Sequence, residues 1–507
     1  MKRRVRYIPL RYLIAILISL FEVTAIIGAV AASCYFVPYF YLLALTVQIY
    51  CVVRIVASDD NPDYKVPWLV FVLVLPVVGF MLYFLFYSRK LKPRFIRRLR
   101  ALENCGYRKD DASLLAGLAE IDITAAGTAW MLCHTGGTHL FVNTKADYFA
   151  SGRAMWERLV ADLKTATSFI YLEFFIMEEG ICLDTVLAIL KEKTAQGVDV
   201  RLLYDDIGCM TTLPGNYAKR LAKYGIRALP FSRLRGNADS EFNNRNHRKI
   251  AIIDGKVGYT GGMNLADEYI GERVRFGHWK DAGVRLEGDA VWELTRLFLV
   301  DYGISSPKLP EIPKDAYPTH VPTDPDGYII PFGDGPRPIY TKRVAKNLIV
   351  RMLSAAVRYV YITTPYLIID NEICTALENA ALRGVDVRIA TPHIPDKKTV
   401  FLMTRSFYPR LIAGGVKIYE YTPGFLHAKC YLADGESAMV GTVNLDYRSL
   451  VHHFENGVWM YRTSCIADIE ADVRSVFMQS ERISVNKKQG AFARFFSALI
   501  RIFAPLM

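Results

Sequence analysis

Two histidines stand in surroundings that repeat along the chain. His247 begins "HRKIAIIDG" and His427 begins "HAKCYLADG", and each is followed two residues later by a lysine, Lys249 or Lys429. Residues two apart on a strand share a face, so each imidazole is expected to lie beside an ammonium group. A neutral imidazole can attack phosphorus, and an ammonium group suits a phosphate oxygen. The pattern therefore predicts chemistry on phosphate esters.

Both motifs continue with the same residue types at the same offsets. An Asp-Gly pair predicts a hairpin turn, a later glycine allows close backbone approach, and an asparagine can donate to an oxyanion. A single His-x-Lys is weak, and the aspartates could be turn residues only, but the second full copy argues against coincidence. The continuing residues are Asp254, Gly261, Gly262 and Asn264 in the first copy and Asp434, Gly441 and Asn444 in the second.

The predicted strands and helices repeat together with the motifs. Buried apolar runs and helical periodicity predict a strand, an amphipathic helix and a second strand in each half. The pentapeptide GVDVR occurs at 197–201 and again at 384–388. The chain is therefore predicted to contain one α/β domain twice. The strand, helix and strand ranges are 167–177, 184–196 and 197–206 in the first half and 356–368, 371–383 and 384–392 in the second.

A stretch rich in proline and polar residues, 305–338, separates the two halves, as expected of a linker or loop. We place the boundary near Ser306. This division gives a first domain at 101–305, a second domain at 306–507 and a separate N-terminal region at 1–100.

Three apolar runs occupy the N-terminal region, at 12–33, 36–56 and 67–87. Each has roughly the length that spans a bilayer, so retained membrane helices are predicted instead of a cleaved signal peptide. Basic residues flank both ends of the set, and three full spans cannot place both ends on the cytoplasmic side. Either the first run does not cross or one basic end lies outside. The basic cluster at 88–100 is expected to lie at an anionic cytoplasmic leaflet.

The composition agrees with a membrane-attached protein that has an anionic partner. Of 507 residues, 52% are hydrophobic, and the formal net charge is +12, which suits lipid headgroups or nucleic acid. Nine cysteines without CxxC spacing predict reduced thiols in cytosol-facing domains. The segment 490–507 has phenylalanines at helical spacing; this amphipathic helix either lies in the membrane interface or packs on the second domain.

The two complete motifs closely resemble the doubled HxKxxxxDxxxxxxG[GST]xN signature of the phospholipase D superfamily. Their surroundings resemble the bacterial cardiolipin synthase family in particular. The likeness runs from about Phe36 to the end and leaves out the first apolar run. The matching residues are His247, Lys249, Asp254, Gly261, Gly262 and Asn264, and then His427, Lys429, Asp434, Gly441, Thr442 and Asn444.

This resemblance implies two α/β sandwich domains, related by a pseudo-twofold axis, whose histidines face one phosphodiester. His247 is expected to be the nucleophile and His427 the general acid, although symmetry leaves the reverse assignment open. The motif histidines, lysines and aspartates are the expected catalytic residues; the asparagines, the glycines and Thr442 are the expected substrate-binding residues. No metal or cofactor is expected.

The implied reaction transfers a phosphatidyl group between two phosphatidylglycerol molecules at the cell membrane, giving cardiolipin and glycerol. Each catalytic imidazole also needs a partner on its other ring nitrogen, commonly a carboxylate. The resemblance offers Asp281 for His247 and Glu455 for His427.

The sequence departs from the family pattern close to both carboxylates. Ala282 and Gly283 stand where a Thr-His pair is usual, and His453 stands where an asparagine usually precedes Phe-Glu. Whether His452 and His453 line the site stays open. The acceptor of the phosphatidyl group also stays open.

Other functions remain as alternatives. A hydrolase would use water as acceptor, and another transferase would use a different alcohol. A membrane-bound nuclease or phosphodiesterase would suit the positive charge, but the sequence has no aromatic platform for bases, so no nucleic-acid partner is expected. A non-enzymatic scaffold would tolerate the loss of one motif. The oligomeric state is not predicted.

Overall fold

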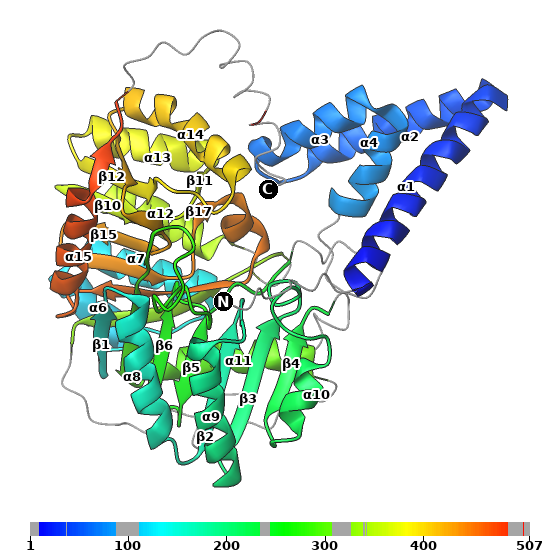
Figure 1. The fold of residues 1–507 in the computed structure, drawn as a ribbon. Coiled ribbons are helices and arrows are strands. Elements are labelled where there is room, and N and C mark those ends of the chain that lie inside the picture. Colours follow the sequence, from blue (N-terminus) through cyan, green and yellow to red (C-terminus); the bar gives the residue numbers. More distant parts are fainter. Residues whose placement is uncertain are drawn as a thin grey trace.

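The computed structural model describes residues 10–36, 38–87, 111–233, 244–306, 326–337, 340, 342–484 and 500. Two sheets with their helices form the bulk of the molecule, and the N-terminal helices stand to one side (Figure 1). The helices are α1 (Leu10–Phe36), α2 (Pro38–Ala57), α3 (Pro62–Val74), α4 (Pro76–Leu82), α6 (Ala112–Ile121), α7 (Ile123–Gly136), α8 (Gly152–Thr165), α9 (Ile181–Ala195), α10 (Tyr217–Ala222), α11 (Val291–Ser305), α12 (Val344–Ala355), α13 (Asn371–Leu382), α14 (Lys398–Ala413) and α15 (Ile466–Met478), with π-helical turns η1 (Tyr83–Tyr87) and η4 (Arg448–His452).

The first sheet has seven strands in the order β1-β8-β6-β5-β2-β3-β4. β2, β3 and β4 run parallel, and the other neighbours are antiparallel. The strands are β1 (Thr144–Phe149), β2 (Phe169–Phe174), β3 (Asp199–Asp205), β4 (Arg227–Phe231), β5 (Ile250–Ile253), β6 (Val257–Gly261) and β8 (Gly283–Gly288).

The second sheet has eight strands in the order β19-β13-β12-β10-β15-β16-β18-β9. Its parallel strands are β10, β12 and β13. The strands are β9 (Tyr328–Asp334), β10 (Tyr359–Thr363), β12 (Asp386–Pro392), β13 (Lys417–Tyr421), β15 (Cys430–Ala433), β16 (Ser437–Gly441), β18 (Glu455–Tyr461) and β19 (Ser480–Arg482). Two short pairs stand apart: β11 (Leu367–Ile368) with β17 (Leu445–Asp446), and β7 (His278–Lys280) with β14 (Gly424–Leu426).

The two sheets repeat one topology. Strands β2, β3 and β4 with β5, β6, β8 and β1 correspond in order and direction to β10, β12 and β13 with β15, β16, β18 and β9. Both GVDVR pentapeptides enter a parallel strand at their aspartate, as β3 or as β12. The predicted duplication of one α/β domain is therefore confirmed.

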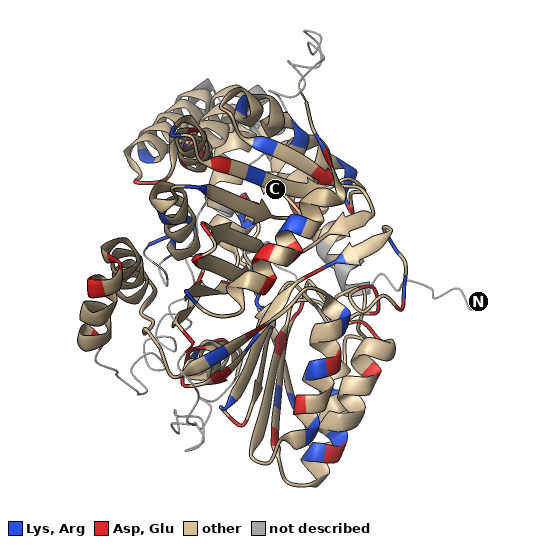
Figure 2. Cartoon of the chain, turned by 90° about the vertical axis from the view of Figure 1, so that its left-hand side faces the viewer, with Lys and Arg blue, Asp and Glu red and all other residues tan. Residues whose placement is uncertain are grey.

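One apolar core joins the two sheets. Phe298 on α11 and Val473 on α15 belong to the same buried cluster as Tyr171 of the first sheet and Leu432 of the second. Each large apolar side chain buried in this way contributes roughly 1.5–3 kcal/mol. Charged residues occur on the helices around the sheets and also on several strands (Figure 2). The shared core fixes the ends of the two sheets relative to each other.

The helical pair α6–α7 packs on the second domain. Leu118 and Leu132 belong to the apolar cluster of Val344 and Leu348 on α12, and the Arg351 guanidinium of α12 donates to the Thr124 carbonyl at 3.2 Å. The range 101–305, predicted as the first domain, therefore includes a segment that covers the second.

The N-terminal apolar runs form helices, and the third of them is broken. α3 ends at Val74 and α4 begins at Pro76, because proline lacks the N–H that would continue the helix. Within the described residues, no helix combines the length and the apolar character needed to cross a membrane. The predicted spans remain a prediction. The basic cluster 88–100 and nearly all of the predicted C-terminal helix 490–507 lie outside the described residues.

Candidate active site

The two motif histidines lie where the domains meet, and the backbone of the opposite domain holds each of them. His247 precedes β5, and its backbone N–H donates to the Phe454 carbonyl at 2.9 Å. His427 precedes β15, and its backbone N–H donates to the Lys280 carbonyl at 2.7 Å. Both side chains are buried. The site is thus complete only when both domains are folded together.

Each histidine is paired with a carboxylate of the other domain. His247 Nδ1 lies 3.0 Å from both carboxylate oxygens of Glu455. His427 Nδ1 lies 2.7 Å from Asp281 Oδ2. The pairing predicted from the sequence, Asp281 with His247 and Glu455 with His427, is wrong. Both carboxylates lie in the site, but each pairs with the histidine of the other domain.

Strand contacts between the domains cause this exchange. β7 pairs in parallel with β14, so Asp281, the residue after β7, lies beside the second motif. The first motif is held in a similar way, because Asn246 forms a β-bridge with Phe454, one residue before the glutamate. Spacing along the chain holds no information on contacts between domains, so the sequence could not reveal the crossed pairing.

The two carboxylates are fixed by different neighbours. The hydroxyls of Thr442 and Ser449 both donate to Glu455. Asp281 accepts from the Ala282 backbone N–H at 2.8 Å, and a Cβ at Gly262 would lie only 1.9 Å from Asp281 Oδ1. Thr442 and Gly262 therefore contact the carboxylates, and their predicted substrate contacts remain a prediction.

Burial keeps both imidazoles neutral. It lowers the pKa of His247 to about 3 and that of His427 to about 4, although the paired carboxylates act in the opposite direction. Burial would raise the pKa values of Glu455 and Asp281, but the adjacent histidines outweigh it and both pKa values lie below the usual range. A neutral ring whose Nδ1–H is held by a carboxylate leaves Nε2 as the nucleophilic or basic atom.

The motif lysines converge from the two domains. Lys249 Nζ donates to the His247 carbonyl at 2.7 Å, and Lys429 Nζ donates to the His427 carbonyl. Burial lowers the pKa of Lys249 to about 7 and that of Lys429 to about 8, and the charge of Lys429 further lowers that of Lys249. Two buried ammonium groups that repel each other favour an anion between them.

The motif asparagines are held by hydrogen bonds within their own domains. Asn264 Oδ1 accepts from the Ile176 N–H at 2.9 Å, and its amide nitrogen donates to the Tyr269 hydroxyl at 2.7 Å. The Tyr269 ring lies 5.4 Å from that of His427. Asn444 is anchored by its backbone N–H, which donates to Ser449 Oγ at 2.9 Å. Asn264 of the first motif is therefore connected through Tyr269 to the second histidine.

Gly261 is the last residue of β6, and Gly441 is the last residue of β16. A Cβ at Gly261 would lie 2.5 Å from the Ala282 carbonyl oxygen, and one at Gly441 would lie 2.4 Å from the Asn456 carbonyl oxygen. Close strand packing explains why both positions are glycine, and the predicted substrate contact remains a prediction.

The motif aspartates have a structural role instead of the predicted catalytic one. Asp254 follows β5 and Asp434 follows β15, at the strand ends opposite to the histidines, with φ angles of 53° and 55°. Each carboxylate accepts three backbone N–H groups at the start of the neighbouring strand. The donors are Thr167, Ser168 and Phe169 for Asp254 and Val357, Arg358 and Tyr359 for Asp434.

The structure adds His453 to the site. Its ring lies 5.4 Å from that of His247. At the same offset before the other carboxylate stands Trp279, whose ring lies 5.6 Å from that of His427. The sequence signal was this offset, two residues before each carboxylate. The site is thus asymmetric at one pair of equivalent positions.

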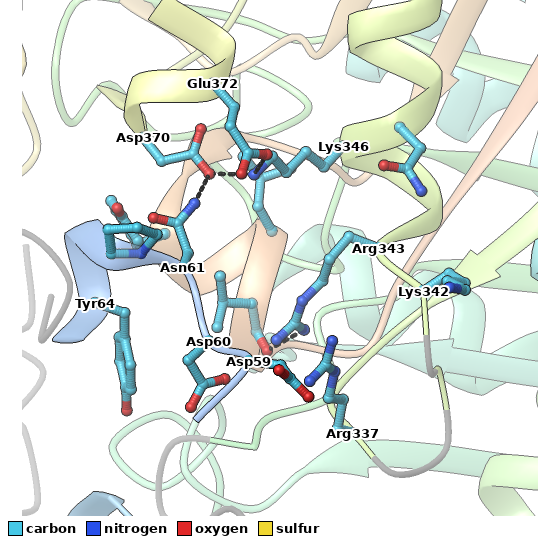
Figure 3. Close-up of a pocket in the computed structure, with 15 residues that line it drawn as sticks. Asp59, Asp60, Asn61, Tyr64, Arg337, Lys342, Arg343, Lys346, Asp370 and Glu372 are labelled. Carbon is cyan, nitrogen blue, oxygen red and sulfur yellow. Dashed lines mark hydrogen bonds and ion pairs between the residues drawn. The ribbon is translucent and has the colours of Figure 1, made fainter. Parts of the chain in front are cut away.

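A pocket of about 400 Å³ lies between the loop that joins α2 to α3 and the second domain (Figure 3). The η4 turn separates it from the site, because Ser449 donates to Glu455 while Tyr447 and Leu450 line the pocket. Its cations and carboxylates are equal in number, so it has no net formal charge. They are Arg337, Lys342, Arg343 and Lys346 and Asp59, Asp60, Asp370 and Glu372.

Asn61 and Asp63 attach this loop to the second domain. The Asn61 amide nitrogen donates to Asp370 Oδ2 at 2.9 Å, and Asp63 Oδ2 accepts from the Asn371 backbone N–H at 2.6 Å. The N-terminal helices are therefore joined to the start of α13 by polar contacts.

Family models match the chain over the motifs and the N-terminal region. The model described as "Cardiolipin synthase, PLD-like domain" matches residues 159–274 and 349–477. The model described as "Phospholipase_D-nuclease N-terminal" matches residues 46–86. Each segment of the first match contains one complete histidine–lysine motif.

Similar proteins extend over most of the chain. An uncharacterized protein of Streptococcus mutans serotype c is 40% identical over 450 residues, which cover 87% of this chain and 96% of the relative. The cardiolipin synthase of Geobacillus sp. (strain WCH70) is 33% identical, with 88% and 89% covered. Cardiolipin synthase 2 of Bacillus anthracis is 31% identical, with 88% and 87% covered.

The solved phosphatidylserine synthase of Haemophilus influenzae Rd KW20 has the same fold, with a TM-score of 0.55 and 12% identity over 75% of this chain and 98% of that one. The doubled motif and the site shared by two domains define a phospholipase D-like protein. Within that class, the chain belongs to the cardiolipin synthase family.

Proposed function

We infer that this chain is a phosphatidyltransferase that makes cardiolipin and glycerol from two phosphatidylglycerol molecules. The observation that carries this inference is the pair of carboxylate-bound histidines in one buried site. Two such groups allow one to form a covalent bond to phosphorus while the other moves the proton. The named cardiolipin synthases supply the substrate class.

In the first half-reaction, His247 Nε2 attacks the phosphorus of the donor phosphatidylglycerol. A P–N bond forms, the P–O bond to glycerol breaks, and the departing oxygen takes a proton from His427. Burial lowers the pKa of His427, but an anionic phosphate favours the protonated imidazole. Bound substrate therefore prepares its own general acid.

In the second half-reaction, a glycerol hydroxyl of the acceptor phosphatidylglycerol attacks the phosphatidyl-histidine. His427 takes the hydroxyl proton, the new P–O bond forms, and the P–N bond to His247 breaks. The products are cardiolipin and the original enzyme. Lys249 and Lys429 stabilise the charge on the phosphoryl oxygens during both attacks.

We propose that the N-terminal helices attach the enzyme to the cell membrane as a multi-pass anchor, with the catalytic domains on the cytoplasmic side. Large apolar side chains are exposed on α1, α2 and α3, including Leu17, Phe21, Leu42 and Val74. Apolar surface of this extent suits lipid better than water. An anchored enzyme meets its lipid substrates without extracting them far from the leaflet.

The test is lipid analysis of a bacterial host that lacks its own cardiolipin synthases. We expect cardiolipin in cells that express the wild type and none in cells that express His247→Ala. His393→Ala is the matched control, because His393 also pairs with a carboxylate, Glu420, at 3.0 Å but lies outside the site. That variant should make cardiolipin like the wild type.

Other lipid profiles would give other functions. Phosphatidic acid in place of cardiolipin would identify water as the acceptor and the enzyme as a hydrolase. A different phosphatidyl ester would identify another alcohol as acceptor. No lipid change in any strain would reject the phosphatidyl donor and point to another phosphodiester.

A further inference from the structure

His453 is a buried histidine that the proposed reaction does not use. It is 8% exposed, and its Nδ1 has no hydrogen-bond partner among the described residues. That atom lies 3.6 Å from Glu455 Oε1, which is too long for a hydrogen bond. A buried polar atom without a partner costs free energy, so this nitrogen is positioned for a group that the described residues do not supply.

The groups near this nitrogen are of types that bind metal ions. His247, His453 and Glu455 each offer one ligand atom, and these atoms all lie within 4.8 Å of one another. Two imidazoles and one carboxylate are ligands that zinc takes, with bonds of about 2.0–2.2 Å. In tetrahedral geometry such bonds place the ligand atoms about 3.4 Å apart. The observed separations of 3.0 Å and 3.6 Å from Glu455 Oε1 lie on either side of this value.

We propose that His247, His453 and Glu455 bind a zinc-class divalent cation that inhibits the enzyme. The cation takes the place of the Nδ1 proton that His247 shares with Glu455. The hydroxyls of Thr442 and Ser449 still donate to that carboxylate and hold it in position. A fourth coordination position remains for water.

Inhibition follows from the two nitrogens of one imidazole ring, and this step rests on the proposed function. A metal bound at Nδ1 of a neutral histidine leaves the ring proton on Nε2. Protonated Nε2 has no lone pair for attack on phosphorus. Metal binding and formation of phosphatidyl-histidine are therefore mutually exclusive.

Among the described residues, the cluster occurs in one half of the site. At the position that corresponds to His453, the other half has Trp279 beside His427, and an indole does not ligate zinc. The second histidine thus has a carboxylate but no further ligand from this position. One cation per chain is expected.

The experiment is calorimetric titration of the full-length, chelator-treated protein in detergent with ZnCl₂, alongside cardiolipin synthesis at each zinc concentration. The wild type should bind one zinc and lose activity over the same concentration range. His453→Asn introduces the amide usual in the family and should weaken zinc binding at least about 100-fold, because even the outer partners of metal ligands contribute 10–100-fold. Its activity, relative to its own zinc-free value, should become insensitive to zinc.

His393→Asn is the matched control, since His393 pairs with Glu420 at 3.0 Å and is not part of the cluster; it should bind zinc like the wild type. Cobalt(II) gives an independent reading, because four-coordinate cobalt absorbs visible light and the band should vanish in His453→Asn. Equal zinc binding by His453→Asn and the wild type would overturn the proposal, as would zinc binding without inhibition of cardiolipin synthesis. If no lipid activity is found but His453-dependent binding is, the metal site stands and the proposed function fails.

Discussion

At the scale of single residues, the crossed histidine–carboxylate pairs determine the chemistry. Each carboxylate holds Nδ1 of one ring, so Nε2 is the ring nitrogen left for the proposed chemistry. The amino-acid types are the same in both halves, but their neighbours differ: hydroxyls donate to Glu455, whereas Gly262 makes room for Asp281. The two histidines are therefore chemically distinct despite the duplication.

Replacing Glu455 by glutamine should cause a large loss of turnover. An amide in place of the carboxylate can hold His247 in the wrong tautomer, and the equivalent change in another histidine–carboxylate enzyme lowers kcat on the order of 10⁴-fold. We expect kcat to fall at least about 1,000-fold with little change in KM, measured by cardiolipin formation in mixed micelles. Asp281→Asn should cause a comparable loss through His427. Turnover near the wild-type value in folded Glu455→Gln would contradict the orienting role.

The lysines predict how activity depends on pH. With pKa values of about 7 for Lys249 and about 8 for Lys429, both lose their charge as the pH rises through this range. The value of kcat/KM, which reports groups of the free enzyme, should therefore decline more steeply above about pH 7, because the loss of the lysine charges adds to the loss of the His427 proton. Rate measurements from pH 6 to pH 10 test this, and a flat profile would show that the lysine charges are not needed.

The same groups affect stability with a defined sign. Between these lowered values and the ordinary lysine pKa of 10.5, the unfolded chain binds more protons than the folded one. Their contribution to the free energy of unfolding therefore increases as the pH rises through this interval. Across this pH interval, the thermal stability of the wild type should increase more with pH than that of Lys249→Met. Thermal unfolding of both proteins at several pH values tests this.

At the scale of elements, short strands place the chemical groups. The hairpins β5–β6 and β15–β16 present a histidine at one end and an aspartate at the other. The aspartate carboxylate binds three backbone N–H groups, which fixes the hairpin to the neighbouring parallel strand. The strand register that aims the histidine thus depends on a residue far from the substrate.

Asp254→Ala should reduce stability and leave catalysis intact. Removal of the carboxylate leaves three backbone donors without their acceptor, at 1–3 kcal/mol for each one that stays buried, so the free energy of unfolding should fall by about 3 kcal/mol. Denaturant unfolding gives the stability, and activity per folded molecule should stay within about twofold of the wild type. An unchanged unfolding curve together with a large loss of kcat would instead make Asp254 catalytic.

The elements also separate what the sequence could predict from what it could not. The repeated motifs and GVDVR strands predicted the duplicated α/β domain, because local periodicity and order along the chain determine those features. Pro76 was a sequence signal for the break in the third apolar run. The run was nevertheless predicted as one helix, because it is apolar on both sides of this proline. Asp254 was predicted to be catalytic because it belongs to the repeated motif. A motif shows which residues recur, but it does not show that this carboxylate binds backbone N–H groups.

The contacts between domains lay beyond sequence reasoning altogether. The sequence identified both Asp281 and Glu455 but assigned each to the wrong histidine. The actual pairing depends on the β7–β14 pair and the Asn246–Phe454 bridge, which join segments far apart in the chain. His453 had a signal in its offset from Glu455. Its missing hydrogen bond became visible only in three dimensions.

At the scale of the whole molecule, two domains share one core and one site. The carboxylate partner of each motif histidine comes from the other half, so neither half is expected to act alone. The N-terminal helices join the second domain next to η4, the turn that supports Glu455. The N-terminal helices, the contact between the domains and the histidine site are therefore adjacent in this fold.

The most direct test of the central claim is mass spectrometry of peptides from enzyme denatured in alkali during turnover of phosphatidylglycerol. The account predicts a phosphatidyl group on the peptide that contains His247, absent from His247→Ala and lost when excess acceptor lipid completes the reaction. A phosphatidyl group on the His427 peptide would reverse the two roles. Cardiolipin formation with no adduct on either histidine, under conditions that trap the intermediate, would contradict the covalent mechanism.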